Sequence, residues 1–387
     1  MPRFGAPTLF VPTRRLASTM PIPSTMNACQ IQEQGELDVI QVREVDVPQP
    51  GKGQVLYKVQ WAGVNFIDTY QRGGLYKLPM PYVLGNESAG VVVALGEGVT
   101  EASHDFKVGD KVAVRYTLYR TWAYLPAYTA GGSFAEYAVS LADKTVKIPE
   151  SMSTKQAATG LLQGLTGKLL QVRITDSSSK SLAETFVYCP ALTFVREAHP
   201  VQKGEYILVQ AAAGGLGGLL VQFTTSTEEK ARIARDFGAD HVILYSGQVD
   251  VVEEVYKITG GEGIDRGVHA VFDGVGKDTF EIDFDLVRRK GTIVSCGNAS
   301  GAVPPFSVLK LGPKNHKVLR PVLNQYVHTK QEFQSYSREL FGLLESGKLR
   351  LSVYQEFPLS TEGIRQAQID IMGRKSSGKL LVKVADE

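Results

Sequence analysis

The chain has 387 residues, of which 43% are hydrophobic and 21% are charged, and its 42 basic and 40 acidic residues leave a formal net charge of +2. This length exceeds the usual size of one hydrophobic core and predicts two domains, while the mixed charge gives no electrostatic footprint for a nucleic acid. The 3 cysteines are too few for a disulfide framework or a four-cysteine zinc site, and no apolar run is long enough to span a bilayer.

Residues 1–25 contain Arg3, Arg14 and Arg15 together with several serines and threonines, and no acidic residue precedes Glu33. This composition is typical of a mitochondrial presequence, and the alternative is a disordered extension before the folded chain. We therefore expect a mitochondrial or a cytoplasmic protein whose fold begins at about Met26.

The remaining chain changes character twice. From Met26 to about Ile148, short β-branched runs broken by glycine and proline predict strands at 54–59, 90–94 and 111–114. From residue 154 onward, apolar strands alternate with helical stretches, which favours a parallel sheet with crossover helices. The last part returns to the character of the first, with predicted helices at 333–344 and 361–372 and predicted strands at 351–353 and 379–384.

We therefore predict an α/β protein with a β-rich catalytic domain formed by residues 26–153 and 318–387. A Rossmann-type domain with a doubly wound parallel sheet, residues 154–317, is inserted between them. Within it, the strand Tyr206–Gln210 runs into the glycine-rich stretch 211–218, whose backbone amides could receive a pyrophosphate. Further strands are predicted at 241–245, 270–273 and 292–296.

Seven ordered motifs after Met26 resemble the NADPH:quinone oxidoreductases, the zeta-crystallin group of the medium-chain dehydrogenase/reductases. They are Gly63-Val64-Asn65-Phe66-Ile67-Asp68-Thr69-Tyr70, Gly85-Asn86-Glu87 with Gly90, Gly109-Asp110-Lys111-Val112, Gly131-Gly132-Ser133-Phe134-Ala135-Glu136-Tyr137, Leu162-Gln163-Gly164-Leu165-Thr166, the glycine turn, and Gly297-Asn298-Ala299-Ser300-Gly301. The resemblance implies a GroES-like catalytic domain beside the Rossmann-type domain.

The resemblance also implies that NADPH reduces a quinone or an α,β-unsaturated carbonyl by hydride transfer, and that two chains form a homodimer. Zinc-dependent relatives place a cysteine at or near Asn65 and a Gly-His-Glu at Gly85-Asn86-Glu87, so no metal is expected here. The alternatives are an enoyl-thioester reductase of the same fold and a non-enzymatic role as a crystallin or as a binder of AU-rich RNA.

Site residues follow from the same resemblance. Asn65, Asp68 and Tyr70 are the candidate catalytic residues; Asp68 could instead cap the following turn, and Tyr70 could be ordinary half-buried packing. The candidate NADPH-binding residues are Asn65, Gly214, Gly215, Leu216, Gly217, Lys230, Tyr245, Cys296, Gly297, Ala299, Arg320 and Arg374. Lys230, Arg320 and Arg374 could each be a surface charge. No acidic residue immediately follows a recognisable second strand; Thr224, Thr225 and Ser226 precede the helix instead, which favours NADPH over NADH.

Two stretches depart from the family pattern. Joining Thr166 to Ala191 restores a continuous helix, so residues 167–190 resemble an insertion, either a retained intron or mispredicted exon or a genuine surface loop. After Gly218, only residues 219–223 precede Thr224, which is too short for a full helix and a second parallel strand. We therefore expect that strand to be missing and NADPH affinity to be poor.

Overall fold

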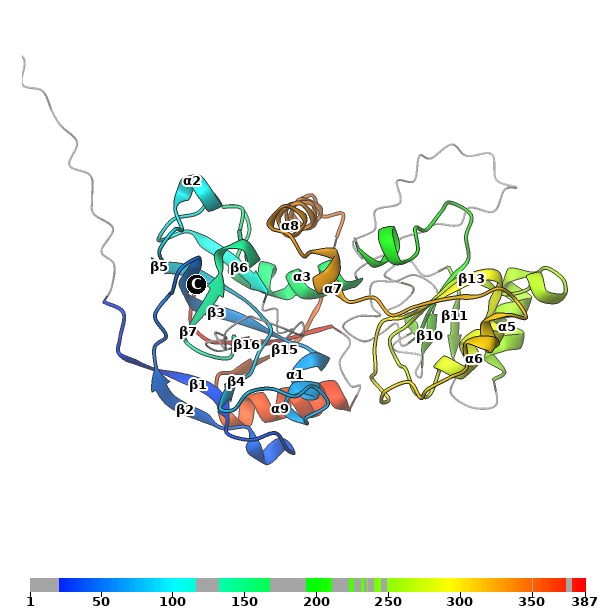
Figure 1. The fold of residues 1–387 in the computed structure, drawn as a ribbon, viewed down its shortest axis with the longest axis horizontal. Helices are drawn as coiled ribbons and strands as arrows, with labels where there is room; N and C mark the ends of the chain where they lie inside the picture. The colour runs from blue at the N-terminus through cyan, green and yellow to red at the C-terminus, as the bar shows by residue number, and fades with distance from the viewer. Residues whose placement is uncertain are drawn as a thin grey trace, which may run out of the picture.

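Figure 1 shows the chain as a computed structural model with two lobes. The structure describes residues 21–115, 132–167, 193–210, 223–225, 231–232, 235, 240–244, 249–349, 351–373 and 378–387. In these ranges, no helix is long and apolar enough to cross a membrane.

The first lobe is built from both ends of the chain, as predicted. Its seven-stranded sheet runs in the order β15-β16-β3-β5-β6-β8, with β7 also paired to β3. The strands are β3 Gln54–Val64, β5 Glu87–Leu95, β6 Lys111–Arg115, β7 Tyr137–Leu141, β8 Thr145–Lys147, β15 Val353–Pro358 and β16 Lys379–Lys383. A smaller sheet joins β1 (Thr25–Ile31) to β2 (Val42–Asp46) and β4 (Tyr82–Val83). Because β16 pairs antiparallel with β3, the last strand of the chain lies in the middle of the first domain.

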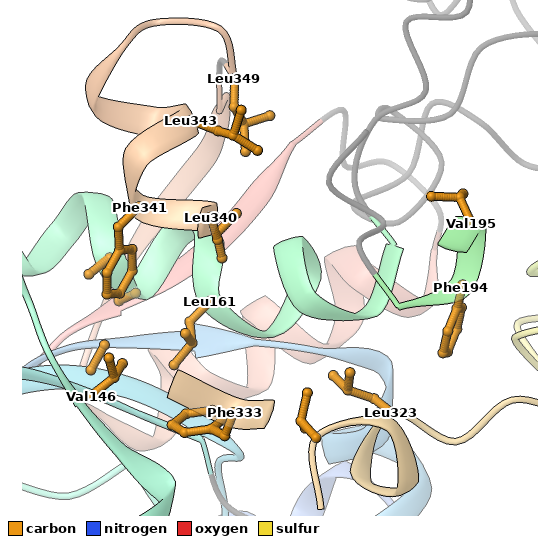
Figure 2. Packing of buried hydrophobic residues seen from close by; sticks show 14 of the residues in the cluster. Val146, Leu161, Phe194, Val195, Leu323, Phe333, Leu340, Phe341, Leu343 and Leu349 are labelled. Carbon is orange, nitrogen blue, oxygen red and sulfur yellow. The ribbon is translucent and has the colours of Figure 1, made fainter. Parts of the chain in front are cut away.

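Helices cover this lobe and connect it to the second. They are α1 Phe66–Arg72, α2 Glu101–His104, α3 Thr154–Gly167, α7 Leu323–Tyr326, α8 Lys330–Glu345 and α9 Thr361–Met372. A capping box between Thr329 and Glu332 starts α8, which buries one face. Figure 2 shows Leu161 of α3 near Leu340 and Phe333 of α8 within one buried cluster. This packing fixes α3 and α8 against the sheet of the first lobe.

The second lobe contains a six-stranded parallel sheet in the order β11-β10-β9-β12-β13-β14. The strands are β9 Ile207–Gln210, β10 Phe223–Thr225, β11 Val242–Leu244, β12 Val268–Asp273, β13 Val287–Ser295 and β14 Lys317–Leu319, with helices α5 Val251–Thr259 and α6 Phe280–Leu286. Numbered along the chain, this is the order 3-2-1-4-5-6 of a Rossmann fold. In such sheets, ligands bind at the carboxyl ends of the strands.

The prediction that the second parallel strand is missing was wrong. Residues 223–225 form β10, which lies between β9 and β11 and pairs with both in parallel. The 12 residues from 211 to 222 connect β9 to β10, and this matches the ~10 to 12 residues that a parallel crossover requires. The prediction was wrong because the residues of the crossover were counted from Gly218, whereas β9 already ends at Gln210.

The predicted limits of the insertion and of the second domain lie at the ends of helices or inside a strand of the structure. Helix α3 ends at Gly167, and the one-turn helix Phe194–Ala198 follows, so most of the proposed insertion 167–190 lies outside the described residues. Helix α3 packs against β3, β5 and β6 of the first lobe, although the predicted second domain begins at residue 154. The predicted division between residues 317 and 318 falls inside β14. The exact domain limits therefore stay a prediction.

Candidate functional site

A buried polar cluster lies where β3 ends and α1 begins. Asn65 precedes the first turn of α1, and its backbone N–H donates to Oδ2 of Asp68 at 2.7 Å. Asp68 is completely buried, so its carboxylate caps the helix from inside the protein. This is the capping role that the sequence allowed as the alternative to a place at the edge of the substrate pocket.

The other side of Asn65 contacts a buried ion pair. Lys379 of β16 and Glu87 of β5 are both fully buried, and Nζ of Lys379 lies 2.5 Å from Oε2 of Glu87. The same Nζ donates to Oδ1 of Asn65 at 2.8 Å, while Nδ2 of Asn65 donates to Oε2 of Glu87 at 3.2 Å and to the Gly63 carbonyl at 3.0 Å. Three strands that are distant in sequence thus fix the orientation of a single amide.

Asp68 is also held by an amide network. Nδ2 of Asn86 donates to Oδ1 of Asp68 at 2.5 Å and to Oε1 of Gln71 at 2.7 Å, and Gln71 donates back to Asn86. Burial raises the pKa of Asp68 to about 7, although hydrogen bonds from Asn86 and Asn65 and the charge of Lys379 act in the opposite direction. Near neutral pH, the cluster therefore contains a carboxyl group that can gain or lose a proton.

The loops at the carboxyl ends of β12 and β13 form the part of the candidate site that belongs to the second lobe. The Asp273 carboxylate accepts hydrogen bonds from the N–H groups of Val275 and Gly276 and from Thr279, which fixes the turn after β12. The N–H groups of Cys296 and Gly297 donate to the Asp273 carbonyl. A Cβ atom on Gly297 would lie 2.2 Å from the Gly274 carbonyl oxygen, so only glycine fits there. The two loops are interlocked mainly through backbone groups.

Cys296, Gly297 and Ala299 therefore lie together, at the strand ends where the fold binds ligands. The Ala299 N–H donates to the Gly274 carbonyl at 3.3 Å, and the Cys296 thiol donates to the Asp273 carbonyl at 3.2 Å. Burial raises the pKa of the Cys296 thiol to about 12, with a further contribution from the charge of Asp273. Cys296 is thus an uncharged lining residue at physiological pH.

Arg320 and Tyr70 both lie near Asn298, in the loop after β13. Arg320 follows β14, and its Nη1 donates to the Ser295 carbonyl at 2.7 Å. The Asn298 amide is oriented by the hydrogen-bond network so that its oxygen accepts from Nη2 of Arg320 at 3.1 Å. Burial raises the pKa of Tyr70 to about 12 and the charge of Tyr76 adds to this, while a hydrogen bond from the Asn298 backbone and the charge of Arg320 lower it. Tyr70 of the first lobe is therefore next to the site in the second.

Known proteins with the same architecture cover nearly the whole chain. Residues 206–341 match the family described as zinc-binding dehydrogenase, and residues 51–150 match the alcohol dehydrogenase GroES-like domain. A probable quinone oxidoreductase of Schizosaccharomyces pombe is 35% identical over 363 residues, which cover 91% of this chain and 95% of the relative. A 2-haloacrylate reductase of a Burkholderia species is 32% identical over 373 residues, covering 92% and 98%. The solved structure of Escherichia coli quinone oxidoreductase complexed with NADPH is 31% identical, with a TM-score of 0.77, covering 93% of this chain and all of that one.

The chain belongs to the quinone oxidoreductase family. This membership, within the medium-chain dehydrogenase/reductases, confirms the resemblance and the predicted fold class of a GroES-like domain with a Rossmann-type domain. The order of the six parallel strands and the derivation of the first lobe from both chain ends agree with it.

The side chains of Asn65, Asn86 and Glu87, at the positions where zinc-dependent relatives have metal ligands, are already paired with other groups of the protein. Among the described residues, no group of three or more His, Cys, Asp or Glu side chains could hold a metal ion. Oδ1 of Asn65 accepts from Lys379, and Oδ1 of Asn86 accepts from Gln71, so both amide oxygens already have donors. The remaining carboxylate, Glu87, is paired with an ammonium group.

The structure brings together the candidates Asn65 and Asp68 in one cluster, and Tyr70, Cys296, Gly297, Ala299 and Arg320 near the strand ends. The remaining candidates lie outside the described residues: Gly214, Gly215, Leu216, Gly217, Lys230, Tyr245 and Arg374. The roles of all these residues stay predictions. Lys379 was not among the predicted site residues, and its only signal was a lysine at the start of the predicted strand 379–384, which also contains Lys383.

Proposed function

We propose that this protein reduces quinones or α,β-unsaturated carbonyl compounds with NADPH, by hydride transfer and without zinc. The observation that carries the proposal is that Tyr70 of the first lobe lies close enough to the loop after β13 for the Asn298 backbone and the charge of Arg320 to act on its hydroxyl, while Arg320 itself binds the Asn298 amide. Ligands of this fold bind there, and the relative from Escherichia coli was solved with NADPH.

When bound, NADPH supplies the hydride from C4 of its nicotinamide, and the acceptor takes up that hydride and one proton. Cys296, Gly297 and Ala299 would line the nicotinamide, and Arg320 would offer its remaining N–H groups to a phosphate or to an acceptor oxygen. The turn 214–217, Lys230, Tyr245 and Arg374 would complete the cofactor site, with Lys230 selecting the 2′-phosphate.

Tyr70 is the proposed hydrogen-bond donor to the acceptor. Its pKa of about 12 keeps the phenol protonated through the physiological range, so it can donate to the oxyanion that develops on a quinone or enone oxygen. Phe66 stacks on Tyr70 with ring centroids 6.3 Å apart, and Tyr76 meets Tyr70 edge-on at 5.8 Å. This half-buried aromatic group suits a planar acceptor.

The test is to replace Tyr70 and measure NADPH oxidation with a quinone and with an enone. We expect Tyr70→Phe to lower kcat by about 100-fold, because it removes a donor to the developing oxyanion while leaving the ring. Tyr76→Phe is the matched control, since its ring meets that of Tyr70 edge-on and the substitution keeps this ring while removing only the hydroxyl. Equal loss in both variants, or no turnover by the unchanged protein with any acceptor, would reject the proposal.

One relative favours the unsaturated carbonyl as the acceptor. A 2-haloacrylate reductase, named for an α,β-unsaturated acid, is 32% identical over nearly all of the chain. Comparing quinones, enones, haloacrylates and enoyl thioesters at one NADPH concentration would separate these acceptors, and the class with the highest kcat/KM identifies the substrate.

We also propose a homodimer. Strand β14 is the edge of the six-stranded sheet, and Val308 and Leu309, shortly before it, are 73% and 81% exposed. Unpaired strand edges and exposed apolar residues favour pairing with a second copy about a two-fold axis. Light scattering of the unchanged protein and of Leu309→Asp would test this, since the variant should be monomeric.

Mitochondrial import likewise stays a proposal, tested by fusing residues 1–25 to a fluorescent reporter.

A further inference from the structure

A fully buried lysine is costly to retain, which makes Lys379 the most informative side chain outside the proposed cofactor site. Its exposure is 1% for the residue and 0% for the side chain, and its partner Glu87 is equally buried. Removing two charges from water costs several kcal/mol per ion, so such a pair adds little net stability compared with apolar side chains of similar volume. The pair therefore requires an explanation other than stability.

The backbone is shaped around this pair. A Cβ atom on Gly63 would lie 2.4 Å from Oε2 of Glu87 and 2.8 Å from Nζ of Lys379. Gly63 faces Leu381 in the antiparallel pairing of β3 with β16, so neither strand can move away without breaking the ladder. The absence of a side chain at residue 63 thus makes room for the ion pair.

Within the described part of the chain, the other hydrogen bonds of the two charged side chains lead to α3 or to the start of α1. Oε1 of Glu87 accepts from the Leu162 N–H of α3 at 2.5 Å, and its Oε2 accepts from both Lys379 and Asn65. Asn65 is the residue at which α1 begins, and Tyr70 lies in the second turn of the same helix. The direction of α1, and with it the position of the Tyr70 hydroxyl, depends on how Asn65 is held.

We propose that Lys379 is a positioning residue for hydride transfer: through Glu87 and Asn65 it fixes the start of α1 and holds Tyr70 against the ends of the Rossmann strands. This inference rests on the proposed reductase function for its kinetic part only. Lys379 itself touches neither cofactor nor acceptor, because its side chain is completely enclosed. Its influence is exerted through geometry, and small displacements at a hydride-transfer site are costly.

The experiment compares Lys379→Met with the control Lys383→Met in the full chain. Lys383 lies on the same strand, but its side chain is exposed and pairs with Asp386 at the surface. Since Lys379→Met leaves Glu87 buried without its partner, the double variant K379M/E87Q, which removes both charges, guards against a simple failure to fold. The readouts are NADPH fluorescence titration, kcat and KM with a quinone, and the primary isotope effect with NADPH deuterated at the transferred position.

For K379M and K379M/E87Q we expect NADPH affinity within about twofold of the unchanged protein, a 10- to 100-fold lower kcat, and a larger isotope effect. K383M should match the unchanged protein in all three. A kcat and isotope effect in K379M/E87Q equal to those of the unchanged protein would overturn the proposal, because a purely structural ion pair would alter stability alone.

Hydrogen exchange tests the same inference without turnover. Peptides covering α1, residues 66–72, should exchange at least about tenfold faster in K379M/E87Q than in K383M, while peptides of α8 should not change. If the unchanged protein oxidises no NADPH, the proposed function fails and this measurement still decides the role of Lys379. Unchanged exchange in α1 would refute the positioning role whether or not the protein is a reductase.

Discussion

The two walls of the proposed site, one in each lobe, are held in place by different kinds of contact. In the first lobe, the wall is supported from behind by buried charged and amide side chains, Lys379 of β16, Glu87 of β5 and Asn65 between β3 and α1. In the second lobe, the loops after β12 and β13 interlock through backbone N–H and carbonyl groups, with Asp273 as the main side-chain contribution. The first wall should therefore be sensitive to charge, and the second mainly to side-chain volume.

The largest effect is expected where volume and charge act together, at Gly63. Gly63→Ala would place a methyl group within 2.4 Å of Glu87 and 2.7 Å of Lys379. We expect a loss of about 3–5 kcal/mol in the free energy of unfolding, since the methyl group would force the buried ion pair apart. Urea denaturation measures this loss. The control is Gly342→Ala in α8, where an added Cβ atom would meet no described atom outside its own turn of helix within 4 Å and a gain of about 0.5–1 kcal/mol is expected. Similar values for the two variants would contradict the crowding argument.

The pH dependence of stability separates the first wall from the second. The folded-state pKa of Asp68, about 7, lies above its ordinary value of 3.8, so its contribution is complete at pH values below about 4 and is lost as the pH rises through 7. We expect the unchanged protein to lose up to a few kcal/mol between pH 5 and pH 8 from this group, and Asp68→Asn to lose correspondingly less. Denaturant midpoints at both pH values give the difference.

Other groups do not obscure this test, because they titrate in both proteins. His269 and His316 have pKa values lowered by burial, so they favour the folded protein as the pH rises, which is the opposite direction. The difference between Asp68→Asn and the unchanged protein isolates Asp68. Parallel pH profiles for the two proteins would show that this carboxyl does not titrate as its burial implies.

The backbone wall should respond to a single methyl group at Gly297. A Cβ atom there would lie 2.2 Å from the Gly274 carbonyl oxygen, so the interlocked loops must separate. We expect Gly297→Ala to cost about 1–3 kcal/mol in stability and to raise the KM for NADPH about tenfold, because the displaced loop carries Cys296 and Ala299. Steady-state kinetics measures the KM. If Gly297→Ala changed kcat while the KM for NADPH stayed constant, the prediction that the displaced loop weakens NADPH binding would be wrong.

This contrast also explains what the sequence could predict. Apolar strands and helical periodicity are local signals, so the strand at 270–273 and the helix at 361–372 were predicted close to their observed bounds, whereas β3 continues to Val64, beyond the predicted 54–59. The Lys379–Glu87 pair joins residues 292 positions apart, and no local pattern encodes that distance. Strand β10 was missed for a related reason: its three residues are defined by pairing with β9 and β11, not by a long apolar run.

The smallest expected effect comes from an ion pair at the surface, which offers the opposite environment to Lys379–Glu87. Arg196 and Glu339 form a two-point contact between the helical turn after residue 193 and α8, and their side chains are 48% and 38% exposed. Water screens exposed charges, so a double-mutant cycle with Arg196→Ala and Glu339→Ala should give a coupling of about 0.2–1 kcal/mol. The coupling should fall further in 0.5 M salt, a concentration at which the screening length is only about 4–5 Å. The same cycle on Lys379 and Glu87 should give a larger coupling that salt hardly changes, since burial excludes the screening ions. If the two couplings and their salt dependences were equal, burial would not distinguish the two ion pairs.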